Sequence, residues 1–222
     1  MNIIKYNLKL NNEDLIFFAP ENDSVVPGTL AALQKNSWHF DRVDFKKDDI
    51  FVDIGCSIGL VSMFASKMFP FIKIYSFDAN PLAIDCFRKS CVENNISNIE
   101  IFNLAVGSLN KKDVKFLTYS ENESCLIERD LCTNERNFEY VCDMVSIDYI
   151  YDKILNYNNV KFLKIDIETG EFDLFTHIFG QRMDILKKTE FLHLEIHPLF
   201  GEKRSEILKS RVEQIFQNKV MF

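Results

Sequence analysis

The sequence predicts one α/β domain in which helices cover both faces of a mainly parallel central sheet. Three observations lead to this prediction. Short apolar segments at 50–54, 72–77 and 99–104 have the length of strands that are buried on both sides. Segments with helical spacing lie between such strands, and this alternation is typical of parallel sheets. A length of 222 residues suffices for one sizeable core, whereas two full domains would be cramped.

Segment 1–47 is predicted to form a hairpin and a helix in front of this core. Apolar residues alternate over 4–10, polar residues at 11–14 provide the turn, and 15–18 return as the second strand. A helix is expected over 27–40. This segment either caps a ligand cleft or packs at the edge of the domain.

The core, 48–197, opens with a strand that ends in a glycine turn. Gly55 and Gly59 let the backbone turn sharply after 50–54 and enter a helix over 60–69. The second strand then delivers Asp78 about 20 residues past the turn, where a carboxylate can accept hydrogen bonds from an adenosine ribose. Alternatively, the two glycines only make a tight connection between strand and helix.

The spacing of the glycines separates the adenosine cofactors. A dinucleotide fingerprint needs glycine at its third and sixth positions, which are Ser57 and Leu60 here, and the Gly-Lys-Ser/Thr loop of ATP sites is absent. S-adenosylmethionine has no phosphate, and its sulfonium and ammonium groups suit the carboxylates of Asp53 and Asp78. The pattern therefore favours S-adenosylmethionine over NAD, FAD and ATP.

Local signals predict the remaining elements. Asn80 and Pro81 are a typical helix start, for a helix that runs to about 95. Extended segments are expected at 99–104, 114–118 and 139–145, and the polar segment 120–137 is either a mobile loop over the site or a linker. Gly180 is expected to end a helix over 172–179. The last segment, 198–222, is expected to hold a helix over 202–218, followed by a short strand at 220–222, a truncated end or a sheet edge covered by another subunit.

Polar side chains gather at two predicted strand ends. In the predicted strand that includes 164–168, alternation places Asp166 and Glu168 on the same side, and in the predicted strand at 194–197 it pairs Glu195 with His197. If these strands are neighbours, the four groups meet at the carboxyl edge of the sheet, where ligands of open α/β sheets bind. Asp166 or His197 would accept a proton there, His197 because its ordinary pKa lies nearest to neutrality. The same four groups are also potential ligands for Mg²⁺ or Mn²⁺, although the reading without a metal is favoured.

Simpler roles remain open for the same region. Glu168 and Glu171 are placed to cap the following helix, and this role is favoured for Glu171. Glu195 and His197 would otherwise form a hydrogen-bonded pair at a strand end. Lys164 is expected to form a supporting salt bridge and to take no part in catalysis.

Four segments also match, in order, the signatures of a known family. They are FVDIGCSIG (51–59), SFDANP (76–81), NLAVG (103–107) and FLKIDIETGE (162–171), with weaker matches at VSID (145–148) and LEIH (194–197). Over roughly 48–197 the sequence thus resembles FkbM-type methyltransferases. It departs from the family's usual Ala-Asn at Cys56 and Ser57, from its glutamate at Asp78, and from Glu-Gly-Ala-Glu at 168–171.

The resemblance implies a Rossmann-like class I methyltransferase fold whose closing C-terminal strand pair is short or missing. It also implies O-methylation, with S-adenosylmethionine as donor, of a hydroxyl on a sugar, a lipid-linked glycan or a polyketide-like molecule. An N-methyltransferase, or a catalytically silent protein that binds S-adenosylmethionine and acts through partners, is the alternative. The catalytic residues implied are Asp166, Glu168 and His197. The cofactor-binding residues implied are Asp53, Gly55, Cys56, Ser57, Gly59, Asp78, Ala79, Asn103, Ala105 and Asp166.

Composition limits the partners and the compartment. The formal net charge of −7 argues against sequence-independent binding to nucleic acid, which depends on Lys and Arg. The sequence contains neither a leader pattern nor an apolar run of membrane-spanning length, so a cytoplasmic protein without membrane insertion is expected. The six cysteines lack metal-site spacing, which predicts free thiols in a reducing compartment. A homo-oligomer through an uncovered sheet edge is also possible.

Overall fold

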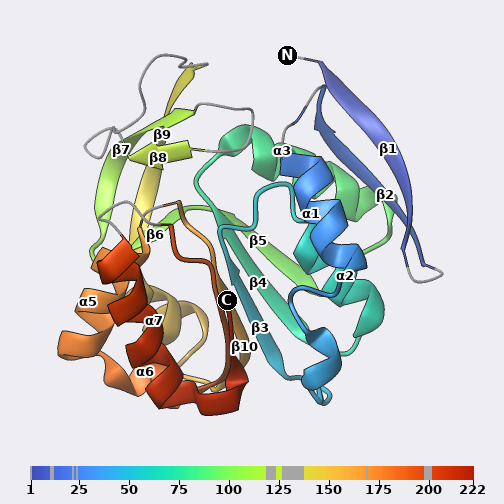
Figure 1. The fold of residues 1–222 in the computed structure, drawn as a ribbon. Helices are drawn as coiled ribbons and strands as arrows, with labels where there is room; N and C mark the ends of the chain where they lie inside the picture. Colours follow the sequence, from blue (N-terminus) through green and yellow to red (C-terminus); the bar gives the residue numbers. More distant parts are fainter. Residues whose placement is uncertain are drawn as a thin grey trace.

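A six-stranded parallel sheet forms the centre of the protein (Figure 1). The computed structural model describes residues 2–10, 13–21, 23, 25–118, 124–126, 138–168, 170–197 and 202–222. Every strand pair in this sheet is parallel, which confirms the predicted mainly parallel α/β fold. In sheet order the strands are β12 (Val220–Met221), β11 (Thr189–Leu194), β10 (Val160–Ile165), β3 (Ile50–Ile54), β4 (Lys73–Asp78) and β5 (Ile99–Asn103).

Helices cover both faces of the sheet because the strands alternate two sets of apolar side chains. Phe162 pairs in register with Phe51 and lies in one core cluster, whereas the next pair, Leu163 and Val52, lies in the other. The first face is covered by α1 (Val25–Gln34), α2 (Leu60–Met68) and α3 (Pro81–Glu93). The second face is covered by α4 (Ile147–Tyr149), α5 (Glu171–Gln181), α6 (Met183–Lys187) and α7 (Glu202–Phe216).

The predicted N-terminal hairpin is confirmed, and it packs on a helix. Strands β1 (Ile3–Leu10) and β2 (Glu13–Pro20) are antiparallel. The amide of Phe18 donates a hydrogen bond to Ser90 Oγ (2.9 Å), which lies on α3. The hairpin therefore covers the outside of α3, as Figure 1 shows, which favours packing over a cap.

Helix α1 is shorter than the helix predicted over 27–40. It ends at Gln34, and Asn36 and His39 then adopt left-handed backbone conformations with φ of 53° and 50°. A regular α-helix cannot continue through such residues. Trp38 is thereby carried on an irregular segment beyond the end of α1.

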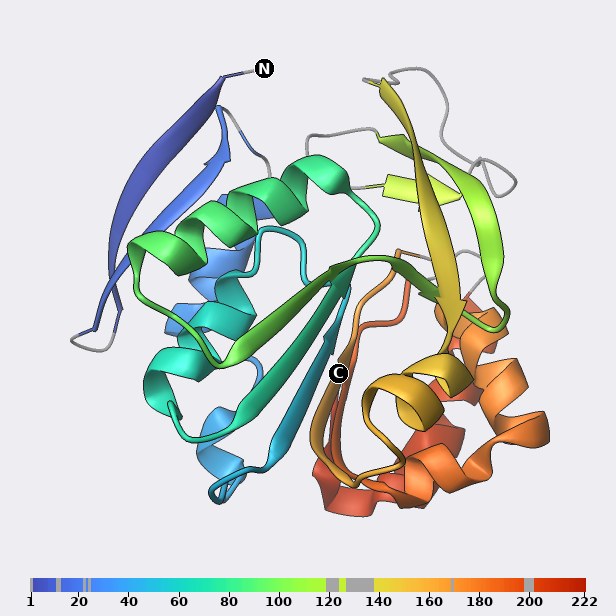
Figure 2. The ribbon, with the colours of Figure 1, turned by 180° about the vertical axis from the view of Figure 1, so that it is seen from behind.

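A second, four-stranded sheet is formed by the part of the chain between β5 and β10. Its order is β6 (Ala105–Gly107), β9 (Phe138–Ser146), β7 (Lys111–Thr118) and β8 (Ser124–Leu126). Figure 2 shows this sheet and the N-terminal hairpin on opposite sides of the molecule. The extended segments predicted at 114–118 and 139–145 are confirmed. Apart from 124–126, the segment 120–137 lies outside the described residues.

Two boundaries predicted in the C-terminal part are wrong. Helix α5 continues through Gly180 to Gln181, since a glycine in a helix costs only about 1 kcal/mol relative to alanine and does not by itself end the helix. The last core strand, β11, ends at Leu194, so Glu195 and His197 follow the strand and are not part of it. The short terminal strand is confirmed as β12, which pairs in parallel with β11.

No helix in the described part of the chain has the length and apolar composition that crossing a bilayer requires.

Candidate active site

The glycine turn connects β3 to α2 through a crowded part of the fold. Gly55 and Gly59 both have φ of +78°. A Cβ on Gly55 would lie 1.6 Å from the carbonyl oxygen of Asp166, and one on Gly59 would lie 2.1 Å from the ring of Phe87. Contacts within the chain thus require both glycines, as the tight-connection alternative expected. Their identity alone is no evidence for a ligand.

Asp78 ends β4 beside this turn. Its Oδ2 accepts a hydrogen bond from the amide of Ser57 and its Oδ1 accepts one from the amide of Asn80, both at 2.8 Å. Burial raises the pKa of Asp78 to about 6, although these two hydrogen bonds lower it. Each carboxylate oxygen still has a lone pair for a further donor. The half-buried carboxylate is therefore fixed in place and can accept hydrogen bonds from a ligand.

Other residues of the predicted cofactor set lie near Asp78 and the glycine turn. Asn103 donates from Nδ2 to the carbonyl oxygens of Asp78 and Ala79, both at 3.0 Å, which ties the ends of β4 and β5 together. Ser57 Oγ is buried and has no hydrogen-bond partner among the described residues. A buried hydroxyl without a partner costs free energy, which a ligand would recover. Cys56 and Ala105 are both buried, and Cys56 borders the small cavity at the glycine turn.

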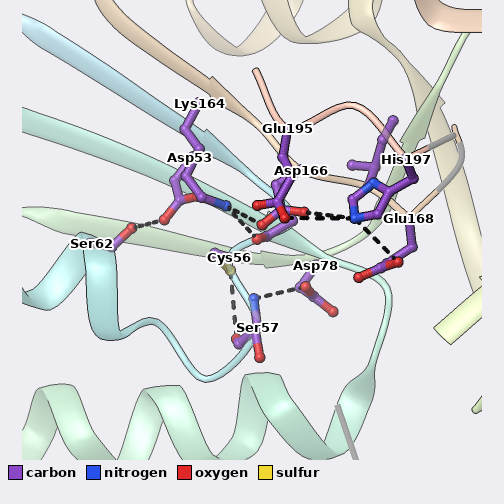
Figure 3. A network of polar contacts seen from close by, with 12 residues as sticks. Asp53, Cys56, Ser57, Ser62, Asp78, Lys164, Asp166, Glu168, Glu195 and His197 are labelled. Carbon is purple, nitrogen blue, oxygen red and sulfur yellow. Dashed lines mark hydrogen bonds and ion pairs between the residues drawn. The ribbon is translucent and has the colours of Figure 1, made fainter. Parts of the chain in front are cut away.

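Asp53 lies behind the site and acts through Lys164 (Figure 3). The side chain of Asp53 is fully buried, and its Oδ2 accepts a hydrogen bond from Ser62 Oγ at 2.6 Å. The Lys164 ammonium is 3.3 Å from Asp53 Oδ1, 3.2 Å from Asp166 Oδ2 and 2.9 Å from the Gly55 carbonyl oxygen. The predicted salt-bridge role of Lys164 is confirmed. A direct contact of Asp53 with a cofactor does not fit this burial.

His197 is the centre of a cluster of carboxylates. Its Nδ1 is 2.9 Å from Glu171 Oε1, and its Nε2 is 3.4 Å from Glu168, 4.0 Å from Asp166 and 3.9 Å from Glu195. The two strand ends therefore do bring the four predicted groups together, as Figure 3 shows. Regular strand alternation is not the cause, because β10 ends at Ile165 and Glu168 has φ of 45°.

The electrostatics of this cluster bear on the proton-accepting role expected of His197. Burial lowers the pKa of His197, but the hydrogen bond to Glu171 and the charges of Glu168, Glu171 and Asp166 raise it to about 9. A pKa above neutrality favours the protonated imidazole, which makes His197 a poorer proton acceptor at neutral pH. A carboxylate is better suited to that role. Asp166 lies between the cations of Lys164 and His197, with its side chain 26% exposed.

Glu171 has a partner that the sequence did not indicate. It lies in the first turn of α5, as the capping hypothesis expected, and it is fully buried. Its Oε1 accepts a hydrogen bond from the amide of Ile167 at 3.3 Å and contacts His197. Glu171 thus holds the turn after β10 and orients the imidazolium.

The metal-binding alternative applies to three of the four predicted groups. Asp166, Glu195 and His197 place ligand atoms within 4.8 Å of one another, whereas Glu168 does not belong to that group. A metal ion would have to displace the proton of His197 and compete with Lys164 for Asp166. Lys164 and the protonated His197 already balance part of the negative charge of these carboxylates, so the group fits a metal ion poorly.

Burial explains the state of the cysteines. Cys56, Cys86, Cys91 and Cys142 are free and buried, as predicted for free thiols. Burial raises the pKa of Cys86 and of Cys142 to about 11, so both thiols stay protonated and unreactive at neutral pH.

The parallel sheet, the glycine turn after its first strand and the carboxylate that ends the second together define a Rossmann-like class I methyltransferase fold. The family model of the methyltransferase FkbM domain matches residues 53–217, and the chain belongs to this family. A curated relative, "Methyltransferase 1" of Beauveria bassiana, is 19% identical over 162 residues, covering 66% of this chain and 65% of that protein. The chain thus spans slightly less than two thirds of the length of this relative.

Solved structures share the fold at low sequence identity. A SAM-dependent methyltransferase from Agrobacterium tumefaciens has a TM-score of 0.51 and 11% identity, covering 94% of this chain and 58% of that chain. A Streptococcus mutans protein described as a methyltransferase, solved in complex with SAH, has a TM-score of 0.47 and 14% identity, covering 84% of this chain and 83% of that chain.

Proposed function

We propose that the protein transfers a methyl group from S-adenosylmethionine to a hydroxyl oxygen of a sugar, a lipid-linked glycan or a polyketide-like molecule. The observation that supports this most is the position of Asp78. It ends the strand next to β3, it is fixed by the amide of Ser57, and it lies beside the unpartnered hydroxyl of that serine. An adenosine ribose, whose two hydroxyls donate to a carboxylate, fits such a place. Membership of the FkbM family supports the same conclusion.

The residues at the carboxyl ends of β10 and β11 supply the acceptor side. When bound, S-adenosylmethionine supplies a methyl group on a positively charged sulfur, which reacts by in-line displacement. Asp166 accepts the proton of the attacking hydroxyl, because His197 holds a proton of its own at neutral pH. Lys164 fixes the orientation of Asp166 from below the site. His197, held by Glu171, provides a positive charge on the other side of Asp166.

Titration calorimetry and a transfer assay test the two halves of the proposal. The protein should bind S-adenosylmethionine and its demethylated product, and it should bind NAD much more weakly. Methyl-labelled donor should then label hydroxyl-bearing molecules in extracts of glycans and lipids, read by mass spectrometry. Absence of donor binding would refute the proposal. Labelling confined to nitrogen would favour an N-methyltransferase, and donor binding without any labelling would favour a silent binding protein.

A further inference from the structure

A cavity of about 610 Å³ lies next to the carboxylate cluster and is not used by the donor site described above. It is bounded by Trp38 after α1, by the end of β11 and by one side of α7. Its volume is within the range of about 300–1,000 Å³ that is usual for small-molecule pockets. Glu195 belongs to the lining of this cavity and also lies 3.9 Å from His197. The cavity therefore opens beside the groups assigned to proton transfer.

Three lining residues have polar atoms without a partner. Trp38 Nε1, His193 Nδ1 and Ser205 Oγ are buried and make no hydrogen bond to the described part of the chain. Trp38 and His193 are only 8% and 6% exposed, and their rings are 6.1 Å apart. A buried polar atom without a partner destabilises the fold. These three atoms are covered in the unliganded protein, so their side chains have to rotate slightly to offer them to a ligand in the cavity, and the hydrogen bonds formed there would recover the lost free energy.

His193 is neutral, so it offers both a donor and an acceptor. Burial lowers its pKa to about 4, and the charge of Lys164, its neighbour in register on β10, acts in the same direction. A neutral imidazole has one N–H and one bare nitrogen. Together with the indole N–H of Trp38 and the hydroxyl of Ser205, the pocket offers both kinds of hydrogen-bonding group.

Charge and shape restrict the ligand further. The carboxylates of Glu195, Glu202 and Glu206 border the cavity, against the single cation Lys209, whose ammonium lies 4.7 Å from the Phe222 ring. An excess of carboxylates repels phosphates and other anions, whereas it accepts hydrogen bonds from hydroxyl groups. The aromatic side chains Trp38 and Phe222 provide apolar surface for the face of a ring.

We propose that this cavity binds a neutral, polyhydroxylated ring of the sugar type, which is the methyl acceptor. The inference rests on the proposed function and narrows its substrate class to sugars. Trp38, His193 and Ser205 hold the ring, and the position of Glu195 at the border directs a hydroxyl towards Asp166. Trp38 also borders the small cavity at the glycine turn, so it lines both the acceptor cavity and the donor side of the site.

The fluorescence of Trp38 tests the proposal directly, because it is the only tryptophan in the chain. The whole protein, without S-adenosylmethionine, is titrated with methyl glycosides of glucose, galactose, mannose and rhamnose. Cyclohexanol and the phosphate esters of the same sugars serve as apolar and anionic comparisons, and free N-acetyltryptophanamide corrects for direct effects of the sugars. We expect a saturable change with at least one glycoside and a weaker response to the two comparison classes.

Two pairs of variants on α7 test whether the signal comes from this cavity. Ser205→Ala should weaken glycoside binding about 3- to 10-fold, as loss of one hydrogen bond implies, whereas Ser210→Ala on the exposed side should not change it. Glu206→Gln should weaken binding while the exposed Glu213→Gln leaves it unchanged. If activity is present, Ser205→Ala should raise the acceptor KM and leave the Kd for S-adenosylmethionine unchanged.

The possible results separate this inference from the proposed function. Glycoside binding without donor binding would support the sugar pocket and refute the methyltransferase proposal. Donor binding with no Trp38 response to any glycoside would overturn the sugar pocket alone. Preference for cyclohexanol or for the phosphate esters, or equal effects of the paired variants, would also overturn it. Dimer formation would overturn the sugar pocket as well, because a second copy of the chain would then fill the cavity. It would appear as a change in Trp38 fluorescence with protein concentration that follows the dimer fraction measured by light scattering.

Discussion

Replacing Glu171 by glutamine should lower the pKa of His197 and remove much of the pH dependence that this histidine gives to stability. The hydrogen bond that His197 Nδ1 donates to Glu171 is the largest of the influences that raise the pKa of His197 to about 9. Glutamine has nearly the same shape and can still accept a hydrogen bond from Nδ1, but it has no charge. The substitution therefore tests the charge separately from the packing.

The size of this effect on stability follows from the difference between the pKa of His197 in the folded and in the unfolded chain. A histidine with a pKa of about 9 in the folded protein and about 6.5 in the unfolded chain stabilises the fold through its charged form. At about 1.4 kcal/mol for each unit of pKa, the contribution is about 3 kcal/mol. This contribution is complete below pH 6.5, declines as the pH rises, and is lost above pH 9. In Glu171→Gln the pKa should fall by at least about one unit, and the decline should begin at a correspondingly lower pH.

Two measurements check this reasoning. NMR titration should give a pKa of about 9 for His197 and about 4 for His193, with the His197 signal assigned by its loss in His197→Gln. Urea unfolding at several pH values should show a smaller change in the free energy of unfolding between pH 6 and pH 10 for Glu171→Gln than for the wild type. The exposed Glu213→Gln is the control. A wild-type His197 that titrates near 6.5, or an unchanged stability profile in Glu171→Gln, would refute the reasoning.

Three further predictions concern other parts of the site. Asp78→Ala should weaken S-adenosylmethionine binding by about 1–3 kcal/mol in calorimetry. The affinity of the wild type should also fall between pH 8 and pH 5, because protonation of Asp78, with a pKa of about 6, removes its charge. An affinity that Asp78→Ala leaves unchanged would exclude the ribose role of Asp78. Gly55→Ala should lower the free energy of unfolding by about 3 kcal/mol or more, because the added Cβ would clash with the Asp166 carbonyl oxygen. Gly180→Ala lies in open space within a helix and should raise the free energy of unfolding by about 1 kcal/mol in denaturant unfolding. Asp166→Asn should reduce kcat by about 100-fold or more with little change in donor Kd; turnover at the wild-type rate would show that Asp166 is not the base.

Local chemistry explains which elements were predictable from the sequence. The start of α3 depends on neighbouring residues alone, since Asn80 Oδ1 accepts hydrogen bonds from the amides of Leu82 and Ala83. The strand β3 and the glycine turn after it were equally local. The predicted helix end at Gly180 is wrong because a glycine ends a helix only where the backbone changes direction. In this helix the change occurs at Arg182, whose side chain pairs with Asp184.

The features that the sequence could not give depend on distant residues. His197 has an ordinary pKa until Glu171, 26 positions away, is folded against it. Trp38 belongs to no motif, and only the fold places it between the end of β11 and α7. Asp53 matched a family signature, yet the signature does not tell whether the carboxylate faces a ligand or a lysine. In the folded protein the carboxylate of Asp53 faces Lys164.

The balance of charge at the strand ends explains why a cationic donor suits this site better than an anionic one. Among the residues that the structure describes, the cations of this site are Lys164 and His197, and the carboxylates around them are Asp53, Asp166, Glu168, Glu171 and Glu195. Both of these cations are already engaged with carboxylates, which leaves neither free for a phosphate, and the excess of carboxylates attracts positive charge. A dinucleotide would bring negative charge into this field, whereas a sulfonium would reduce it. The preference for S-adenosylmethionine over NAD, drawn first from the glycine spacing, thus has a second and independent physical basis in the field of the folded site.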